Sequence, residues 1–278
     1  MTASTGKQGR SIDFSKYPDT LKLDLHDNVL TITLNNPTMA NAFLPEMDEA
    51  MTRIFWDADA DPDVRVIILT GAGKAFCAGG DIDAMHAGID DINLFMHGVK
   101  NGKRFMQAMI DCDKPIVARV QGDAVGLGAT LALYADIVVA SENARFADPH
   151  VRVGLVAGDG GAIIWPKNVG YAHAKYFLMT GDMVSAREAQ AMGLIAKVTT
   201  EADLDAEVAR IVGKLNNGAL QAITYTKHVL NIGIRQLFAS SVDAGFALET
   251  VTGRLPDHRE AVEAFAQKRK PDFRKKRE

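Results

Sequence analysis

The amino-acid sequence predicts an α/β core followed by a helical C-terminal region, and two patterns indicate this. From Leu21 to about Val198, short β-branched runs alternate with segments that have the apolar spacing of helices. Beyond Glu201 the apolar positions keep helical spacing and no strand candidate remains. We therefore expect three parts: a flexible lead over residues 1–20, the α/β core over 21–200 and the helical region over 201–278.

The elements of the core can be assigned in order along the chain. Residues 21–25 and 29–34 are strand-like and flank Asp27 and Asn28, a pair that favours a hairpin turn. Residues 46–59 have the apolar spacing of a helix, and residues 88–113 predict a second, longer one. Further short apolar runs predict strands at 66–69, 116–120, 137–140 and 196–198.

Composition favours a globular protein and excludes several functional classes. With 278 residues, 47% of them hydrophobic, the chain can bury a large core. A formal net charge of −4 disfavours nucleic acid or an anionic membrane as a partner. Polar residues and glycines interrupt the longest apolar stretch, 124–140, and the N-terminus lacks the apolar centre of a secretion signal. Two cysteines, Cys77 and Cys112, make no disulfide framework, so we expect a cytoplasmic protein without a membrane span.

A glycine-rich turn after a buried strand is the first candidate for a binding site. It runs from Ala75 to Ile82 with the sequence AFCAGGDI. Gly79 and Gly80 can adopt a positive φ without steric cost, and Asp81 suits the first turn of a helix. The N–H of Gly80 could then hold an oxyanion, or the turn could have no ligand. Cys77 could be a nucleophile, although a small buried thiol is the interpretation we favour.

A second glycine-rich turn has the same context. Residues 120–128, VQGDAVGLG, follow a strand and precede a helical run. Two strand-turn-helix units can direct their N–H groups at one oxygen. With donors from Gly80 and Leu127, the pair would polarise a carbonyl and stabilise an enolate or a tetrahedral oxyanion.

With these two turns the chain resembles the crotonase, or enoyl-CoA hydratase/isomerase, superfamily from about Leu21 to Phe273. The resemblance implies a spiral of ββα units with a C-terminal helical trimerisation segment, packed as a homotrimer or a dimer of trimers. It implies an acyl-CoA substrate whose thioester carbonyl lies between the N–H groups of Gly80 and Leu127, with no other cofactor and no metal. Further landmarks are Asn35-Asn36-Pro37, Asn41-Ala42-Phe43, Ala135-Asp136-Ile137, Gly154-Leu155, Thr180-Gly181, Glu188-Ala189, Gly193-Leu194-Ile195 and Ala264 to Pro271.

The same resemblance implies contacts to coenzyme A. The carbonyl of Ala78 and the side chain of Ile82 would lie near adenine, and the backbone of Ala40 along the pantetheine. Phe265 and Lys268 of a neighbouring subunit would lie near the nucleotide phosphates, where a cation suits the charge. The alternative for Lys268 is a solvated lysine in a charged tail.

The chain departs from the hydratase pattern at two positions. Hydratases of this superfamily place glutamates where this sequence has Thr130 and His150, so their two-glutamate addition of water does not transfer. A dyad of His150 and Asp159 could activate water instead, with Asp159 fixing the tautomer of the ring. This pair resembles the branch of the superfamily that includes 6-oxocamphor hydrolase, whose additional oxyanion histidine falls at Leu127.

Simpler roles are possible for the same residues. Asp159 suits the N-cap of a helix that begins near Gly160, and His150 could be a pocket-wall histidine. Asp148 is interpreted as a loop or cap residue, and the six other histidines, including His97, as surface or packing residues.

Three functions therefore stay open. The first is an acyl-CoA enzyme that uses the oxyanion donors together with His150 and Asp159. The second is a cofactor-free β-diketone hydrolase that cleaves a carbon–carbon bond by a retro-Claisen reaction. The third is a non-catalytic RNA-binding homologue, which the acidic composition disfavours. The acyl group would contact Leu127, Thr130 and the helix from Met85 to Phe95.

Overall fold

The structure is a computed structural model that describes residues 12–274. Its main sheet has six strands in the order β1-β2-β3-β4-β6-β9. The first two strands are antiparallel and all other neighbours are parallel, so the predicted hairpin at Asp27 and Asn28 is confirmed, with both residues at positive φ. The strands are β1 (Leu21–His26), β2 (Val29–Leu34), β3 (Val66–Gly71), β4 (Ile116–Val120), β6 (Ile137–Ser141) and β9 (Lys197–Thr199).

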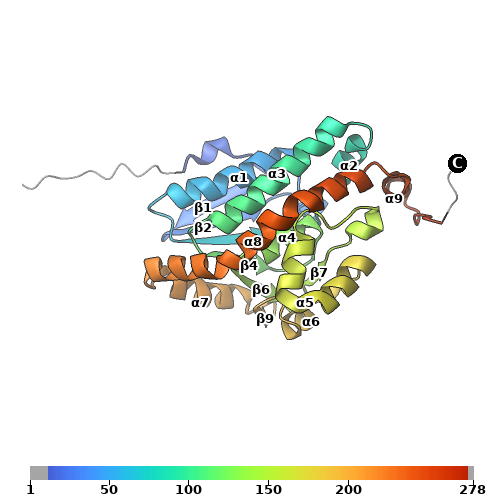
Figure 1. Cartoon of the computed structure of the whole chain (residues 1–278). Coiled ribbons are helices and arrows are strands. Elements are labelled where there is room, and N and C mark those ends of the chain that lie inside the picture. Colours follow the sequence, from blue (N-terminus) through green and yellow to red (C-terminus); the bar gives the residue numbers. More distant parts are fainter. Residues whose placement is uncertain (1–11, 275–278) are drawn as a thin grey trace, which may run out of the picture.

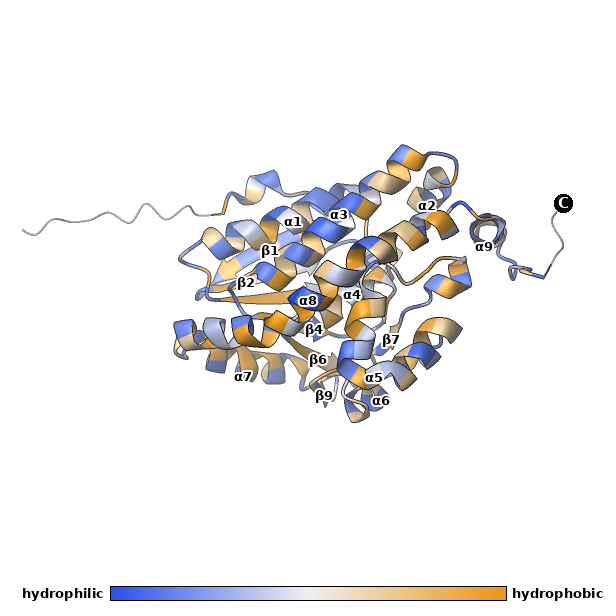
Figure 2. Ribbon diagram, in the orientation of Figure 1, coloured by the Kyte–Doolittle hydropathy of each residue, from blue (hydrophilic) through white to orange (hydrophobic). Residues whose placement is uncertain are grey.

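Helices cover the sheet on both sides (Figure 1). On one side lie α1 (Pro45–Ala60) and α3 (Ile92–Asp111), and on the other lies α7 (Leu204–Asn216). Adjacent residues of a strand serve opposite faces. Val66, Val117 and Val139 pack against α7, whereas their strand neighbours join the larger core on the α1 and α3 side. Figure 2 shows the hydrophobic strands between helices whose outer faces are hydrophilic.

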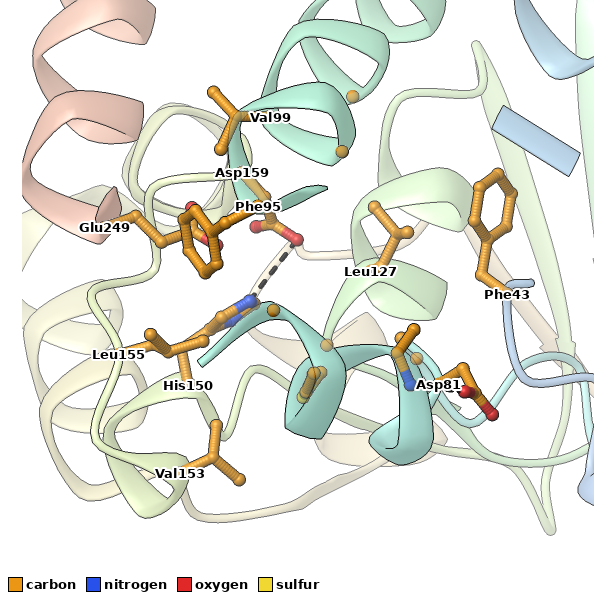
Figure 3. A pocket seen from close by; sticks show the side chains of 18 of the residues that line it. Phe43, Asp81, Phe95, Val99, Leu127, His150, Val153, Leu155, Asp159 and Glu249 are labelled. Carbon is orange, nitrogen blue, oxygen red and sulfur yellow. Dashed lines mark hydrogen bonds and ion pairs between the residues drawn. The ribbon is translucent and has the colours of Figure 1, made fainter. Parts of the chain in front are cut away.

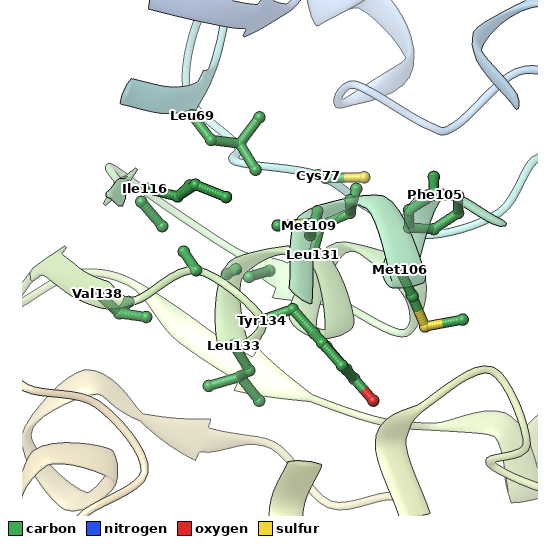
Figure 4. Packing of buried hydrophobic residues seen from close by; sticks show 14 of the residues in the cluster. Leu69, Cys77, Phe105, Met106, Met109, Ile116, Leu131, Leu133, Tyr134 and Val138 are labelled. Carbon is green, nitrogen blue, oxygen red and sulfur yellow. The ribbon is translucent and has the colours of Figure 1, made fainter. Parts of the chain in front are cut away.

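The larger core lies between the sheet, α3 and a short helix, α4 (Leu127–Leu133). Leu69 and Ile116 of the sheet pack with Leu131 of α4 and Met109 of α3 (Figure 4). All four side chains are almost fully buried. Burying a side chain of this size stabilises a fold by about 1.5–3 kcal/mol, so this core holds α4, and the turn before it, in place.

A second, small sheet lies next to the site. Its order is β5-β7-β8, formed by β5 (Ala124–Val125), β7 (Arg145–Ala147) and β8 (Val184–Ser185). The remaining elements are α2 (Ile82–Gly88), α5 (Gly161–Thr180), α6 (Ala186–Ala191), α8 (Leu220–Thr252), α9 (Pro256–Ala266) and three 3₁₀ helices at Phe14–Lys16, Pro37–Met39 and His150–Val153.

Two expectations differ from the structure. The helix expected over 88–113 is confirmed as α3, which begins at Ile92, but the helix expected from Met85 to Phe95 is divided, because α2 ends at Gly88 and Asp91 caps the start of α3 through its side chain. Residues 12–20 are packed on the core, although the sequence suggested a flexible lead over 1–20. The N–H of Ile12 donates to Asp61, and the hydroxyl of Tyr17 donates to Asp57 at 2.6 Å. The rest of that lead, residues 1–11, lies outside the described residues.

The helical region expected over 201–278 consists of α7, α8 and α9 as far as it is described. In the part of the chain from 12 to 274, no helix is long and apolar enough to cross a membrane.

The two glycine-rich turns touch through their backbones. The N–H of Val125 donates to the carbonyl of Cys77 at 2.9 Å, and the two strands form a parallel bridge at Cys77 and Ala124. A Cβ on Gly128 would lie 2.3 Å from the oxygen of Cys77, and one on Gly122 would lie 2.0 Å from the oxygen of Lys74. Only glycine permits these approaches.

Gly128→Ala therefore tests the contact between the turns. We expect it to lower the free energy of unfolding by about 1–3 kcal/mol, since the new methyl group must push a backbone carbonyl away. Urea unfolding measures the change. The matched control is Gly213→Ala in α7, where a Cβ meets no atom within 4 Å and alanine should be neutral or stabilising. Equal stability of the two variants would contradict the prediction.

Candidate functional site

One cavity of about 350 Å³ contains both glycine-rich turns. Its wall also includes α2, the first half of α3, the 3₁₀ helix at His150–Val153 and part of α8. Most of the lining is apolar, and Figure 3 shows Phe43, Leu127, Phe95 and Val99 around the space. A concave, mostly apolar site with a few polar groups is typical of small-molecule binding.

Gly80 and Leu127 each present a backbone N–H at this cavity. Both residues line it, and neither N–H has a hydrogen-bond acceptor among residues 12–274. Leu127 is the first residue of α4, so its N–H has no partner within the helix. Gly126 before it has a φ of 54° and directs the chain into the helix. Two free N–H groups in one cavity are the arrangement that stabilises an oxyanion.

Asn41 holds the first turn in shape. Its side chain is fully buried, and Nδ2 donates to the carbonyls of Ala72 and Ala75 at 2.8 and 2.9 Å. The carbonyl of Ala40 accepts the N–H of Ala78 at 3.0 Å. Asp81 accepts the N–H of Ala84 and so caps α2. Asn41, Ala40 and Asp81 thus hold the backbone on both sides of Gly80 in place.

His150 lies between two carboxylates. Its Nδ1 forms a short hydrogen bond with Asp148, which is fully buried, and its Nε2 lies 3.4 Å from Oδ2 of Asp159 (Figure 3). Asp159 does not cap α5, because the N-cap residue is Gly160 and no side chain bonds there. The ring also lies beside the second turn, since a Cβ on Gly126 would be 3.9 Å from Cε1 of His150.

The two carboxylates decide the charge of the ring. Burial alone lowers the pKa of His150, but the charges of Asp159 and Asp148 outweigh it and raise the pKa well above the usual value. At neutral pH His150 is therefore an imidazolium. The ring therefore acts first as a proton donor, and it can accept a proton only after it has given one up.

Glu249 of α8 is a functional residue that sequence reasoning missed. It lines the cavity, it is 8% exposed, and its Oε2 has no hydrogen-bond partner in the described residues. Burial raises its pKa to about 8, helped by the charges of Asp159 and Asp148 and opposed by that of His150. The sequence feature that could have identified Glu249 is its helical spacing from Val242 and Phe246, which places all three on the buried face of α8.

Asp148 was also missed, because the sequence gave it a loop or cap role. It follows β7 directly, and its bond to Nδ1 makes it the residue that orients the ring. Asp148, His150 and Asp159 together have the spacing of a metal site, with one ligand atom of each within 4.8 Å of the others. A histidine that holds its proton is a poor ligand, so this charge state favours proton transfer over metal binding.

The structure separates the residues expected to bind substrate into two groups. Ala78, Ile82 and Phe265 line the cavity, and Phe265 does so in its own chain. Thr130 does not line it: the side chain is fully buried in α4, behind the cavity wall. Ala40 and Lys268 are not lining residues either. Burial raises the pKa of Cys77 to about 12, which excludes it as a nucleophile and agrees with a small buried thiol.

Comparisons with known proteins agree on one family. The sequence profile described as enoyl-CoA hydratase/isomerase matches residues 24–276. A probable enoyl-CoA hydratase of Rhodobacter capsulatus is 31% identical, with 91% of this chain and 97% of the relative covered. The solved structure of an enoyl-CoA hydratase/isomerase from Mycobacterium paratuberculosis superimposes with a TM-score of 0.86 at 35% identity, covering 89% of this chain and 98% of the other.

A second similar structure has a different activity in its name. It is a β-diketone hydrolase from the cyanobacterium Anabaena, bound to (S)-3-oxocyclohexyl acetic acid. The TM-score is 0.78 at 28% identity, and the match covers 87% of this chain and 96% of the other.

Glu249→Gln tests the burial of this acid through the pH dependence of stability. The folded protein holds the Glu249 proton more tightly than the unfolded chain, so its contribution to stability is lost as pH rises from about 4.5 to about 8. Relative to the parent, the variant should therefore gain roughly 1–3 kcal/mol over that interval. Urea unfolding at several pH values measures it, with the exposed Glu46→Gln as control. Parallel profiles of parent and Glu249→Gln would contradict the prediction.

Proposed function

Since the chain belongs to the enoyl-CoA hydratase/isomerase family, we propose that it acts on an acyl-CoA thioester and adds the elements of water to it. The observation that carries this proposal is the pair of free N–H groups, on Gly80 and Leu127, in the same cavity as the ion pair of His150 and Asp159. The N–H groups would hold the thioester oxygen, and the ion pair would supply and remove protons.

The charge of the cluster suggests the direction of each proton transfer. Nδ1 of His150 is held by Asp148, so Nε2 is the atom that exchanges a proton. In the proposed reaction Asp159 accepts a proton from water while the water oxygen bonds to Cβ of an enoyl thioester. The electron pair of the double bond moves to the thioester oxygen, giving an enolate that the two N–H groups hold. Nε2 of His150 then protonates Cα, and proton transfer from Asp159 to Nε2 restores the pair.

A β-diketone hydrolase is the second candidate, and the similarity to the Anabaena hydrolase favours it. The same residues would suffice. Water would attack one carbonyl carbon as Asp159 takes its proton, the carbon–carbon bond would break to give a carboxylic acid and an enolate, and His150 would protonate the enolate carbon. We rank the acyl-CoA function first, because Phe265 and Lys268 match the C-terminal pattern that the family resemblance associates with coenzyme A.

Turnover of two substrates separates these candidates. The purified protein is incubated with crotonyl-CoA, followed by loss of the enoyl absorbance, and with a cyclic β-diketone, followed by release of the carboxylic acid. We expect turnover of the thioester. Turnover of the diketone alone would refute the first candidate and support the second.

His150→Gln and Asp159→Asn test the proton transfers. Each should lower kcat by roughly 10²-fold or more on the substrate that is turned over, since each removes a general acid or base. His173→Gln, at an exposed position on α5, is the matched control and should retain the parent rate. Near-parent rates for both site variants would refute their roles.

A homotrimer, or a dimer of trimers, is also part of the proposal. In it, Phe265 and Lys268 of one subunit would approach the coenzyme A bound to the next. Large apolar side chains exposed on α5 and α8 support an assembly, namely Tyr171, Tyr176, Met179, Tyr225, Val229, Leu230, Ile232, Leu248 and Val251.

Light scattering on the purified protein tests the assembly. We expect a mass of three or six copies of the 30.0-kDa chain. The double variant Val229→Glu, Leu230→Glu should lower that mass, because it charges the exposed face of α8. A mass of one chain for the parent protein would contradict the proposal.

A further inference from the structure

The cavity has a second group of polar side chains, away from His150. Outside the His150 cluster, the polar residues of its wall are Asp48 of α1, His97 of α3 and Asp81, which directly precedes α2. Asp81 is occupied, because its carboxylate caps α2. Asp48 and His97 are therefore polar groups in an apolar wall that neither the proposed chemistry nor helix capping uses. The sequence suggested a surface or packing role for His97, and its side chain is exposed as well as part of the cavity lining.

A buried amide holds these two side chains. Asn101 lies one turn beyond His97 on α3 and is 1% exposed. Its Nδ2 lies 2.9 Å from Nε2 of His97, and its side chain also bonds to Asp48. Because an amide nitrogen only donates, Nε2 of His97 is the acceptor, and the ring carries its hydrogen on Nδ1. Asn101 thus orients an acceptor, Asp48, and a donor, His97.

The carboxylate of Asp48 is partly shielded from water, and no lysine or arginine side chain in the described part of the chain balances its charge. Burial raises its pKa to about 6, although the hydrogen bond from Asn101 lowers it. The charge of Glu49 raises it further. In residues 12–274, no lysine or arginine forms an ion pair with Asp48. A half-buried acceptor in this state gains most from a donor on a ligand.

Apolar side chains make up most of the cavity lining between the turns, α1 and α3. In Figure 3, His150 and Asp159 lie on one side of Leu127 and Phe43 on the other. Phe43 lies two residues before the start of α1 and packs on Phe105 of α3, with the ring centroids 5.6 Å apart. Asp48 and His97 belong to these same two helices, so a ligand that they bind also meets this apolar lining.

We propose that Asp48 and His97, oriented by Asn101, bind a hydroxyl group that the substrate carries at the end remote from its polarised carbonyl. A hydroxyl both donates and accepts, so it can satisfy the carboxylate and the ring N–H together. A keto group only accepts and an ammonium group only donates, so each would leave one partner unsatisfied. The assignment rests on the proposed function in one respect, that a carbonyl oxygen occupies the N–H groups of Gly80 and Leu127.

The test uses pairs of methyl ketones that need neither coenzyme A nor turnover. Each pair has the same number of chain atoms, from four to eight beyond the carbonyl, and ends either in a hydroxyl or in a methyl group. Dissociation constants come from NMR titration of the full-length protein. In at least one pair we expect the hydroxyl ketone to bind about tenfold more tightly, in the range of a hydrogen bond to a charged group.

Variants of Asp48 and His97 test whether these two residues cause the preference for the hydroxyl ketone. Asp48→Leu should abolish it and strengthen binding of the methyl-ended ketone, whereas Asp48→Asn should keep part of it. Glu46→Gln, in the first turn of α1 and exposed, is the matched control and should keep the full preference. If thermal unfolding shows that Asp48→Leu does not fold, His97→Leu takes its place with the same expectation.

Four results would overturn the assignment. For the parent protein, these are preference for the methyl-ended ketone at every length, tighter binding of an ammonium-ended ketone, and no binding of any ketone. For the variants, it is a hydroxyl preference that survives in Asp48→Leu or His97→Leu. Failure of the proposed function is recognised separately, because it would appear as no turnover of crotonyl-CoA or of the β-diketone while the hydroxyl preference is still measurable.

Discussion

The backbone contact between the two glycine-rich turns is the constraint on which the rest of the site depends. Gly122 and Gly128 let one turn rest on the carbonyls of Lys74 and Cys77 at distances that no side chain would permit. The N–H groups of Gly80 and Leu127 belong to separate strand-turn-helix units, and this contact fixes their separation. The donors are therefore set by the fold itself, before any ligand enters, which is the condition under which hydrogen bonds to an oxyanion are most effective.

His150 gives the site its chemical character. A ring between Asp148 and Asp159 keeps its proton, while Glu249 close by is also protonated over much of the neutral range. The cluster therefore holds two protons and two carboxylates in a small volume. In the proposed function this combination would take the place of the glutamate pair that the family resemblance implies for hydratases. It would suit a reaction in which one water molecule is divided between two carbon centres.

Much of the fold could be predicted from sequence, because the long strands and helices have clear periodicity. The six strands of the main sheet were found, and so was the position of both turns in the wall of one cavity; the role of Gly80 and Leu127 as donors stays a prediction. The small sheet has strands of two or three residues, too short for any pattern to show. Asp148 and Glu249 were missed because their roles arise from tertiary packing. Thr130 was expected in the cavity wall, but the rotation of α4 turns its side chain into the core.

The long helix α8 contributes both to the cavity and to the exposed apolar surface, whereas the sequence pattern predicted it only as part of a C-terminal helical region. One side of it brings Phe246 and Glu249 into the cavity, while the other side exposes Leu248 and Val251 to whatever lies outside the chain. Under the proposed assembly, α8 would contact a neighbouring subunit on its outer side and position Glu249 on its inner side. The subunit interface and the cavity would then be separated by a wall one helix thick.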